Sequence, residues 1–331
     1  TAVHADPILN AHFAVALTAA AVLAAALPAL AGPPARTVEP ALPMTPEGDF
    51  SEQALRRGVR ATRAQCDALA NAVWASTRDH GEACVRYWAA GFSTGPNERA
   101  IVFLHGDNWI GPGKTRPQYL SLTGEALAQQ AQQWSRKLDA PYVFLARPGT
   151  HGSSGDHMQR RRAGESALIS AALDTIKARL RIRELVVAGQ SGGGHVTSSL
   201  LTLRSDIVCA VPTSAPSSPR IRWQLKGLKT DTTGHSDSYE PSEHLTGLKR
   251  HPALRVFVLG DPADRNVLWP SQTIMATRLK QAGVPVETLE GNGAGEDRHG
   301  LPNSARRVAG WCYKDLPTAE IRRQAALGLS G

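Results

Sequence analysis

One serine in the chain lies in a setting that could make it a nucleophile. Gly189-Gln190-Ser191-Gly192-Gly193 fits the pattern G-x-S-x-G, in which a serine occupies a sharp turn between a strand and a helix. An apolar run precedes it and a helical pattern follows. A serine hydroxyl is a weak nucleophile, so it needs exposure, a neighbouring base and backbone N–H donors for an oxyanion. The segment therefore indicates acyl transfer, the alternative being an accidental match in a chain with 30 glycines.

Strand and helix patterns alternate around this turn from residue 100 onward. Short apolar runs are typical of buried strands, whereas apolar positions three and four residues apart are typical of amphipathic helices. Strands are predicted at residues 100–104, 142–146, 185–188, 207–211, 254–259 and 286–289. Helices are predicted at residues 122–138, 168–180, 272–282, 303–313 and 318–328, and directly after Ser191. This alternation predicts the α/β class, with a mostly parallel central sheet covered by helices on both faces.

The order of these elements, with a serine turn after a central strand, resembles the alpha/beta-hydrolase superfamily over residues 70–315. The stretch from Arg147 to Gly155, RPGTHGSSG, resembles largely architectural loops of dienelactone-hydrolase-like and prolyl-oligopeptidase-like members. The resemblance implies the alpha/beta-hydrolase fold. Residues 214–252 interrupt the alternation and are long for a connection. They are expected to form a small cap insertion over the site, the alternative being a solvated insertion.

The resemblance also implies a catalytic triad in the chain order serine, acid, histidine. Ser191 matches the nucleophile. The base is expected in the loop after the last strand, where His299 is the only histidine. The acid is expected in the loop after the strand at 254–259, where Asp264 is the first choice and Asp261 the alternative. The acid would hold the imidazole tautomer and stabilise the imidazolium.

Two backbone N–H groups are expected to form the oxyanion hole. One belongs to Gly192, directly after the nucleophile, where a helix N-terminus adds partial positive charge. The resemblance assigns the other to Asp107, in the segment His105-Gly106-Asp107 after the strand at 100–104. A carboxylate so near a developing anion must be paired or point away. Arg147 is a candidate partner, and a cationic group on the substrate is the alternative.

Other side chains near these motifs have weaker claims to a role. Trp109 and Ile110 are candidates for lining an apolar substrate pocket, or simply pack. His151, His157 and His195 are expected to be structural or surface histidines. No metal is expected, because the chain has no H-E-x-x-H segment and its cysteine spacing fits no zinc motif. The expected chemistry needs no organic cofactor.

The N-terminal part of the sequence has the pattern of an export signal. Residues 12–31 are apolar and alanine-rich and end in Ala29-Leu30-Ala31, an A-x-A cleavage pattern. The expected organisation is a signal peptide at 1–31, a linker at 32–50 and a hydrolase domain at 51–331. No Lys or Arg precedes the apolar run, so a basic region is expected upstream of Thr1. The alternative is an uncleaved anchor, because the run approaches the length of a membrane span.

Four cysteines are consistent with an exported protein, in which disulfides form and persist. Four cysteines allow three connectivities. We expect Cys66–Cys84, which closes a short local loop, and Cys209–Cys312. The alternative is buried free thiols. Around the first pair, residues 73–91 are predicted to form a hairpin.

Composition limits the classes of partner. The 331 residues carry a formal net charge of +8, with 42% apolar residues, enough for a sizeable core. Basic residues are dispersed, apart from Arg160-Arg161-Arg162, and no basic stripe is interleaved with aromatic residues. Nucleic-acid binding is therefore not expected. The expected partner is a small ester or a short peptide, and no stable membrane insertion is expected after signal cleavage.

These observations together predict a secreted or periplasmic serine hydrolase that cleaves carboxylic esters through an acyl-enzyme. A serine peptidase, either prolyl-oligopeptidase-like or an exopeptidase, is the first alternative. It is less favoured because residues 32–331 are too few to include the propeller of full prolyl oligopeptidases. The second alternative is a catalytically inactive binding protein on the same fold, since a fold alone does not determine activity.

Overall fold

A computed structural model describes residues 39–109 and 115–331. The predicted signal peptide at 1–31 and the pocket candidate Ile110 lie outside the described residues. The elements in chain order are β1 (Leu42–Pro43), α1 (Glu52–Arg57), β2 (Val59–Arg60), α2 (Arg63–Asp67), β3 (Ala72–Ser76), β4 (Glu82–Ala90), β5 (Asn97–Leu104), α3 (Pro117–Leu120), α4 (Gly124–Leu138), β6 (Tyr142–Leu145), η1 (His157–Gln159), α5 (Ala163–Leu180), β7 (Ile182–Gln190), α6 (Gly192–Leu200), β8 (Ile207–Thr213), α7 (Pro219–Leu225), η2 (Pro241–Glu243), β9 (Arg255–Gly260), α8 (Trp269–Gln281), β10 (Val286–Glu290), α9 (Pro302–Tyr313) and α10 (Thr318–Ala326).

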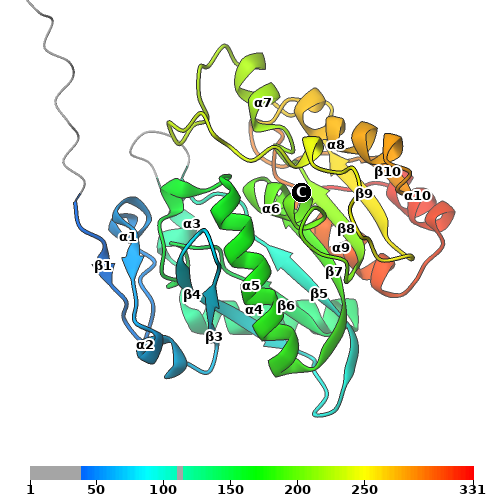
Figure 1. Cartoon of the computed structure of the whole chain (residues 1–331). Helices are drawn as coiled ribbons and strands as arrows, with labels where there is room; N and C mark the ends of the chain where they lie inside the picture. The colour runs from blue at the N-terminus through cyan, green and yellow to red at the C-terminus, as the bar shows by residue number, and fades with distance from the viewer. Residues whose placement is uncertain (1–38, 110–114) are drawn as a thin grey trace, which may run out of the picture. The chain divides into compact units, whose positions relative to one another are not determined.

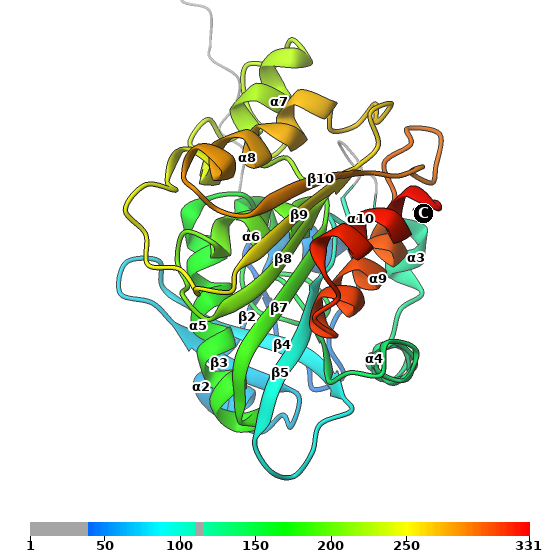
Figure 2. The ribbon, with the colours of Figure 1, turned by 90° about the vertical axis from the view of Figure 1, so that its right-hand side faces the viewer.

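Within the described residues, the central sheet has eight strands in the order β10-β9-β8-β7-β5-β6-β4-β3 (Figures 1 and 2). Strands β5 to β10 pair in parallel, and β4 pairs antiparallel with both β3 and β6. Strand β7, which leads into the Ser191 turn, lies in the interior of the sheet between β5 and β8. The prediction of a mostly parallel sheet is confirmed.

Helices cover both faces of the sheet, because successive strand residues point to opposite sides. Along β5, Ala100, Val102 and Leu104 pack into one apolar cluster, and Ile101 and Phe103 pack into another. Helices α5, α6 and α8 contribute to the first cluster. Helices α4, α9 and α10 contribute to the second. The long apolar strands of the sequence are therefore buried from both sides, as parallel strands usually are.

The first described residues form a small structure of their own beside the hairpin β3–β4. For residues 39–50 the sequence predicts part of a linker, but β1 pairs in parallel with β2 and Met44 is buried. The Cys66–Cys84 disulfide joins α2 to β4 within this region. The hairpin itself forms as the sequence predicts, with Val73 opposite Val85.

A second disulfide, Cys209–Cys312, joins β8 to α9 over a sequence separation of 103 residues. Strand β8 lies next to the strand that carries the Ser191 turn, and α9 follows the loop that carries His299. The crosslink therefore ties the helix after the His299 loop to the strand next to the one that leads to Ser191. Within the described residues, no helix is both long and apolar enough to cross a membrane.

Residues 214–252 leave the sheet between β8 and β9 and contain only α7 and the short turn η2. Helix α7 lies beyond the end of β8 and next to α8 (Figure 1). Glu240 holds the start of α7 in place, because its carboxylate accepts from Ser218 Oγ at 2.6 Å and from Arg220 N at 2.7 Å. These contacts hold the parts of the insertion together. Ser271 Oγ, which donates to the Ser218 carbonyl at 2.9 Å, and His195 Nε2, which lies 2.8 Å from the Tyr239 carbonyl, link it to the domain.

Candidate active site

The turn at Ser191 forces an unusual backbone on a residue with a side chain. Ser191 has φ 55° and ψ −117°, a strained region that side chains rarely adopt. The surrounding glycines make the turn possible. A Cβ on Gly189 would overlap the backbone of Gly193, and a Cβ on Gly194 would lie 2.7 Å from Ala215 Cβ. The sequence pattern therefore reflects a tight strand-to-helix turn that presents the Ser191 hydroxyl at its apex.

Three side chains predicted from the sequence form one hydrogen-bonded chain at this turn. His299 Nε2 lies 2.8 Å from Ser191 Oγ, and His299 Nδ1 lies 2.7 Å from Asp264 Oδ2. With the proton on Nδ1, the imidazole donates to the carboxylate and Nε2 accepts from the serine hydroxyl. Both His299 and Asp264 are buried, so the chain is largely shielded from water. The geometry can deprotonate the hydroxyl as it attacks a carbonyl.

Asp264 is held for this contact by donors from its own loop and from helix α8. Its Oδ1 accepts from Asn266 N at 2.7 Å and Val267 N at 2.9 Å, and its Oδ2 also accepts from Gln272 Nε2 at 3.1 Å. Apart from His299, the groups that donate to this carboxylate are therefore neutral amides. No guanidinium or ammonium group of the described residues lies within ion-pair distance of it.

Asp261, the alternative acid of the sequence analysis, has different partners. It accepts from Arg298 Nε, Gly293 N and Ala263 N, each at 2.8 Å. Burial raises the pKa of Asp261, but these donors outweigh it and hold the pKa below its usual value. The side chain thus fastens the acid loop to the histidine loop, and it does not contact His299.

Gln190 is a site residue that the sequence analysis missed. Its Nε2 donates to the His299 carbonyl at 2.8 Å, and its Oε1 accepts from Leu301 N at 3.1 Å. The Gln190 amide therefore holds the histidine loop by hydrogen bonds to the carbonyl of His299 and to the N–H of Leu301. The variable position of the G-x-S-x-G pattern gives no hint of this, because the partners lie 109 and 111 residues away.

The segment after β5 lies against the Ser191 turn, as the expected oxyanion hole requires. A Cβ on Gly106 would lie 3.4 Å from Ser191 Cβ, and a Cβ on Gly192 would overlap the Asp107 carboxylate. Gly192 and Asp107 are therefore close neighbours beside the nucleophile. Their N–H groups are the two donors that the sequence analysis assigns to an oxyanion.

The Asp107 carboxylate is paired with arginines. Its Oδ1 accepts from Arg147 at 2.8 Å, and its Oδ2 accepts from Arg160 Nε at 3.0 Å and from Arg161 Nη1. Burial raises the pKa of Asp107, but the three guanidinium groups outweigh it and hold the pKa well below its usual range. Arg147 is thus a partner as expected, and Asp107 is already paired without a cationic substrate group.

This cluster includes two further carboxylates, Glu165 of α5 and Asp231 of the cap insertion. Arg147 also pairs with Glu165 at 2.7 Å, and Arg161 also pairs with Asp231 at 2.6 Å. Asp231 belongs to the insertion between β8 and β9, so Arg161 links that insertion to the segment of Asp107. Two members of the run Arg160-Arg161-Arg162, the one local cluster of basic residues noted in the sequence, are therefore buried and ion-paired.

The three histidines near the motifs are buried in the domain. His195 Nε2 lies 2.8 Å from the Tyr239 carbonyl, and burial lowers the pKa of His195 to about 4. Burial likewise lowers the pKa values of His151 and His157 well below the usual value. None of the three hydrogen-bonds to Ser191, His299 or Asp264. They remain neutral packing partners at neutral pH.

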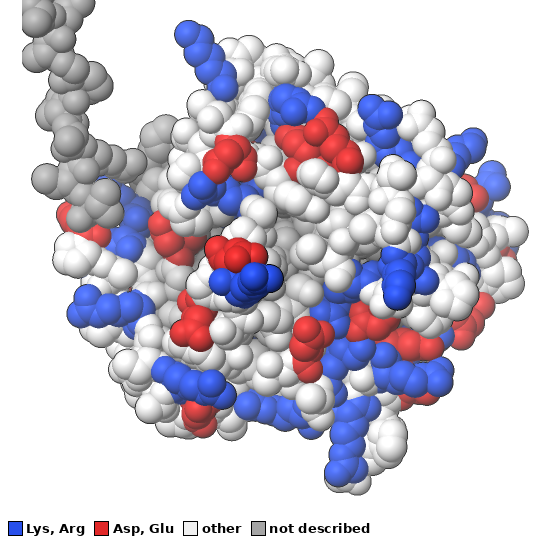
Figure 3. Space-filling view, in the orientation of Figure 1, with Lys and Arg blue, Asp and Glu red and all other residues white. Residues whose placement is uncertain are grey.

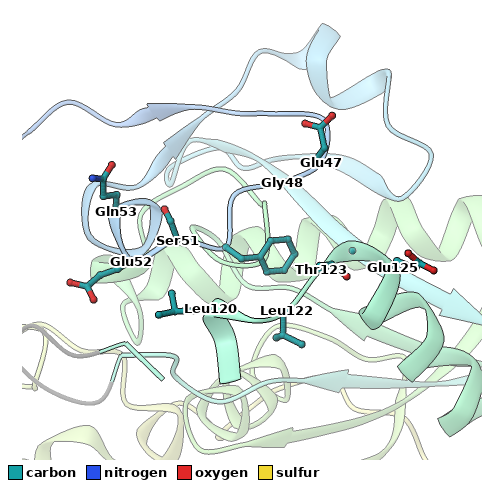
Figure 4. A pocket seen from close by; sticks show the side chains of 11 residues that line it. Glu47, Gly48, Ser51, Glu52, Gln53, Leu120, Leu122, Thr123 and Glu125 are labelled. Atoms are coloured by element: carbon teal, nitrogen blue, oxygen red, sulfur yellow. The ribbon is translucent and has the colours of Figure 1, made fainter. Parts of the chain in front are cut away.

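A separate pocket of about 850 Å³ lies on another part of the domain (Figure 4). It is lined by residues near the start of the described chain and by the connection into α4, namely Glu47, Gly48, Phe50, Ser51, Glu52, Gln53, Leu120, Leu122, Thr123, Gly124 and Glu125. Neither the Ser191 chain nor Trp109 contributes to this lining. Trp109 is half-buried and bridges Thr115 through its backbone. In the described part of the chain, no three His, Cys, Asp or Glu side chains are placed to hold a metal ion.

Comparisons with known proteins place this geometry on a known fold. No protein-family model and no curated protein matches the chain. Solved structures do match. An acylaminoacyl peptidase in complex with Z-Gly-Gly-Phe-chloromethyl ketone superposes with a TM-score of 0.50 at 14% identity, over 74% of this chain and 40% of the peptidase. The Pyrococcus furiosus esterase Pf2001 superposes with a TM-score of 0.50 at 15% identity, over 77% of this chain and 95% of the esterase.

The chain thus spans 40% of the length of the peptidase and nearly all of the esterase. At such identities the likeness concerns the fold. The mostly parallel sheet of eight strands, the helices on both of its faces and the serine turn after an interior strand agree with it. The chain therefore has the fold of the alpha/beta-hydrolase superfamily.

Proposed function

We propose that the protein is an exported serine hydrolase that cleaves carboxylic esters through an acyl-enzyme intermediate. The observation that carries this proposal is the hydrogen-bonded chain from Ser191 Oγ through His299 to Asp264, with distances of 2.8 and 2.7 Å. A buried imidazole between a serine hydroxyl at a strained turn and a buried carboxylate is the arrangement that activates a serine nucleophile. Structural roles alone do not call for it.

In the proposed reaction, Ser191 Oγ attacks the ester carbonyl while its proton moves to His299 Nε2. Asp264 holds the Nδ1 proton and stabilises the imidazolium that forms. The N–H groups of Gly192 and Asp107 donate to the tetrahedral oxyanion. His299 then protonates the departing alkoxide, which leaves an acyl group on Ser191. A water molecule, deprotonated by His299, attacks the acyl carbonyl and releases the acid and the free serine.

Ester hydrolysis is preferred to amide hydrolysis as the proposed activity. The same three side chains serve both, but an amide nitrogen leaves only after protonation, which demands closer positioning of the leaving group. The acylaminoacyl peptidase and the esterase share the fold and do not separate the two activities. A serine peptidase therefore remains the alternative that the experiment must exclude.

We also propose that the protein is exported, on the evidence of its two disulfides. Two disulfides cross-link the described residues, and free cysteines are absent from that part of the chain. Disulfides persist in oxidising compartments and are rare in the reducing cytosol. A secreted or periplasmic location is consistent with these crosslinks and with the apolar, alanine-rich pattern at residues 12–31.

A fluorophosphonate probe tests the nucleophile. We expect labelling of wild-type protein at Ser191 and none in Ser191→Ala, with matched thermal unfolding to show that the variant is folded. A panel of 4-nitrophenyl esters and of aminoacyl and prolyl 4-nitroanilides then tests the bond that is cleaved. Turnover of esters only supports the proposal. Faster turnover of the anilides supports the peptidase, and an unlabelled, inactive wild type indicates a binding protein.

A further inference from the structure

Arg222 places a guanidinium group between the cap insertion and the proposed catalytic residues. It lies on α7 and is half-buried. Its Nη2 donates to Asn266 Oδ1 at 2.8 Å and its Nε donates to the Asn266 carbonyl at 3.4 Å. Asn266 N in turn donates to Asp264. The guanidinium therefore lies at the loop of the proposed acid, and α7 holds it there from the cap.

Unlike its neighbours, Arg222 has no carboxylate partner within residues 39–109 and 115–331. Arg147, Arg160 and Arg161 each form at least one ion pair with Asp107, Glu165 or Asp231. No ion pair joins Arg222 to a carboxylate of the described residues, and its only side-chain hydrogen bonds there go to the neutral Asn266. Its Nη1 has no hydrogen-bond partner among the described residues. Of these four arginines, Arg222 is thus the one that forms no ion pair among the described residues.

Electrostatics agree with this surplus of positive charge. Burial lowers the pKa of Arg222, and the nearby Arg161 lowers it further, while Asp231 and Asp107 only partly offset them. Arg222 therefore lies close enough to Asp107 and its arginine partners to interact with them electrostatically, and it also contacts the Asp264 loop. Burial and Arg222 also lower the pKa of Lys226, one turn further along the chain. The carboxylates of Asp264 and Asp297 act in the opposite direction and raise it, so Lys226 lies near enough to the proposed acid to interact with its charge.

An uncompensated guanidinium that is partly removed from water is unfavourable on its own. Its burial becomes favourable when an anion accepts hydrogen bonds from it, because the N–H groups of a guanidinium match the oxygens of carboxylate and phosphate groups. On the side of the molecule that Figure 3 shows, Lys and Arg are interspersed with Asp and Glu. The missing partner is best supplied by the substrate.

We propose that Arg222, assisted by Lys226, binds an anionic group of the substrate, so that the enzyme prefers esters that carry a carboxylate or a similar anion. This rests on the proposed function at Ser191 and adds the substrate class. The anion lies beside the reacting ester, on either its acyl part or its alcohol part. Arg222 then acts as a specificity-determining residue, and Asn266 orients its guanidinium.

Matched ester pairs test the proposal directly. On the acyl side, 4-nitrophenyl hydrogen adipate is compared with 4-nitrophenyl hexanoate. On the alcohol side, 3-carboxy-4-nitrophenyl acetate is compared with 4-nitrophenyl acetate. For each pair the readout is the ratio of kcat/KM for the anionic ester to that for the neutral ester, corrected for spontaneous hydrolysis. We expect the wild-type ratio to exceed one in at least one pair, and to fall as salt is added.

Variants assign the preference to Arg222. Arg222→Gln should lower the ratio by about tenfold or more, because hydrogen bonds to charged groups contribute that much. Arg222→Lys should restore part of it, and Lys226→Gln should lower it less. The matched control is Arg220→Gln on the same helix, where the exposed guanidinium pairs with Glu243 and should not affect the ratio.

The outcomes separate this inference from the proposed function. A wild-type ratio of one or less in both pairs overturns the inference, as does an Arg222→Gln variant whose ratio equals that of the wild type. If anionic and neutral esters lose activity equally in Arg222→Gln, the residue only supports the fold of the loop, and the inference also fails. In each of these cases, turnover of the neutral ester and probe labelling at Ser191 leave the proposed function standing.

Discussion

Asp261 and Asp264 lie three residues apart in one loop and are almost equally buried, with 1% and 2% of their surfaces exposed. Burial alone therefore does not distinguish them. The Asp264 carboxylate accepts hydrogen bonds from two backbone N–H groups, from one side-chain amide and from His299. The Asp261 carboxylate accepts hydrogen bonds from two backbone N–H groups and forms an ion pair with Arg298. Asp261 already has a cation, Arg298, as its partner. Asp264 has none besides His299, so its negative charge is available to stabilise the imidazolium in the proposed reaction.

The largest expected effect is that of Asp264→Asn. An amide at this position donates to His299 Nδ1, so the imidazole proton moves to Nε2, which can then no longer accept from Ser191. We expect kcat for a 4-nitrophenyl ester to fall about 10⁴-fold. Steady-state kinetics measure it, with Asp261→Asn as the matched control. If Asp264→Asn and Asp261→Asn lose similar activity, the two carboxylates do not differ in the way proposed.

Replacement of Gln190 tests whether its two hydrogen bonds to the histidine loop are needed to position His299. Gln190→Ala leaves the His299 carbonyl and the Leu301 N–H without their partner, which costs about 1–3 kcal/mol of unfolding free energy. A loosened base should lower kcat by about 10- to 100-fold while KM changes little. Gln190→Glu keeps the acceptor for Leu301 N but sets a carboxylate oxygen against the His299 carbonyl, so it should not recover the stability. Unchanged kcat in Gln190→Ala, despite lower stability, would show that other contacts place His299.

Asp261→Asn should act on stability more than on turnover. The amide has a single acceptor oxygen, so it cannot accept from Ala263 N and also from Gly293 N and Arg298, as the two carboxylate oxygens do. A donor therefore loses its partner, at a cost of about 1–3 kcal/mol. We expect kcat to stay within about tenfold of the wild-type value, since neither His299 nor Ser191 loses a contact. Urea unfolding and ester kinetics on the same preparation measure both.

The pH dependence of that stability difference has a definite sign. The pKa of Asp261 is lowered in the folded protein, so its contribution is fully present above the unfolded value of about 3.9. It is lost as the pH falls from that value through the folded pKa. Wild type and Asp261→Asn should therefore differ most near neutral pH and converge in acid. A difference that grows in acid contradicts the assignment.

The smallest expected effect is that of removing the exposed partner. Arg298 has a side chain that is 46% exposed and a backbone φ of 55°, so Arg298→Asn removes the ion pair with a residue that tolerates this backbone. Water can replace the lost donor, and the loss of stability should be smaller than for Asp261→Asn. Ester turnover should not change measurably. A larger loss than for Asp261→Asn would mean that Arg298, and not the carboxylate, organises the loop.

Much of the fold could be predicted from the sequence, because its signals are local. The apolar runs became β5 to β10, and the spacing of Leu168, Ile169, Ala172, Leu173 and Ile176 marks the buried face of α5. The glycines around Ser191 mark a turn that few other residues allow. The order of Ser191, Asp264 and His299 was enough to select residues that lie within hydrogen-bond distance, and their catalytic role stays a prediction.

Contacts between distant segments could not be predicted. Nothing near Gln190 in the chain reveals that it holds the His299 loop, and nothing near Arg161 reveals Asp231 as its partner, 70 residues away. The run Arg160-Arg161-Arg162 resembles a solvated patch until the fold places Asp107 against it. The short pairing of β1 with β2 was also missed, because two-residue strands have no periodicity.

The Cys209–Cys312 crosslink has a consequence for the unfolded chain. Both Asp264 and His299, together with the whole cap insertion, lie inside the ring that it closes. A ring of this size removes enough conformational freedom from the denatured ensemble to stabilise the native state by about 4–5 kcal/mol in the chain-entropy model. That is comparable to the net stability of many domains. After reduction, the proposed acid and base would be held near Ser191 by non-covalent contacts alone, which makes thiol concentration a control on how long activity survives.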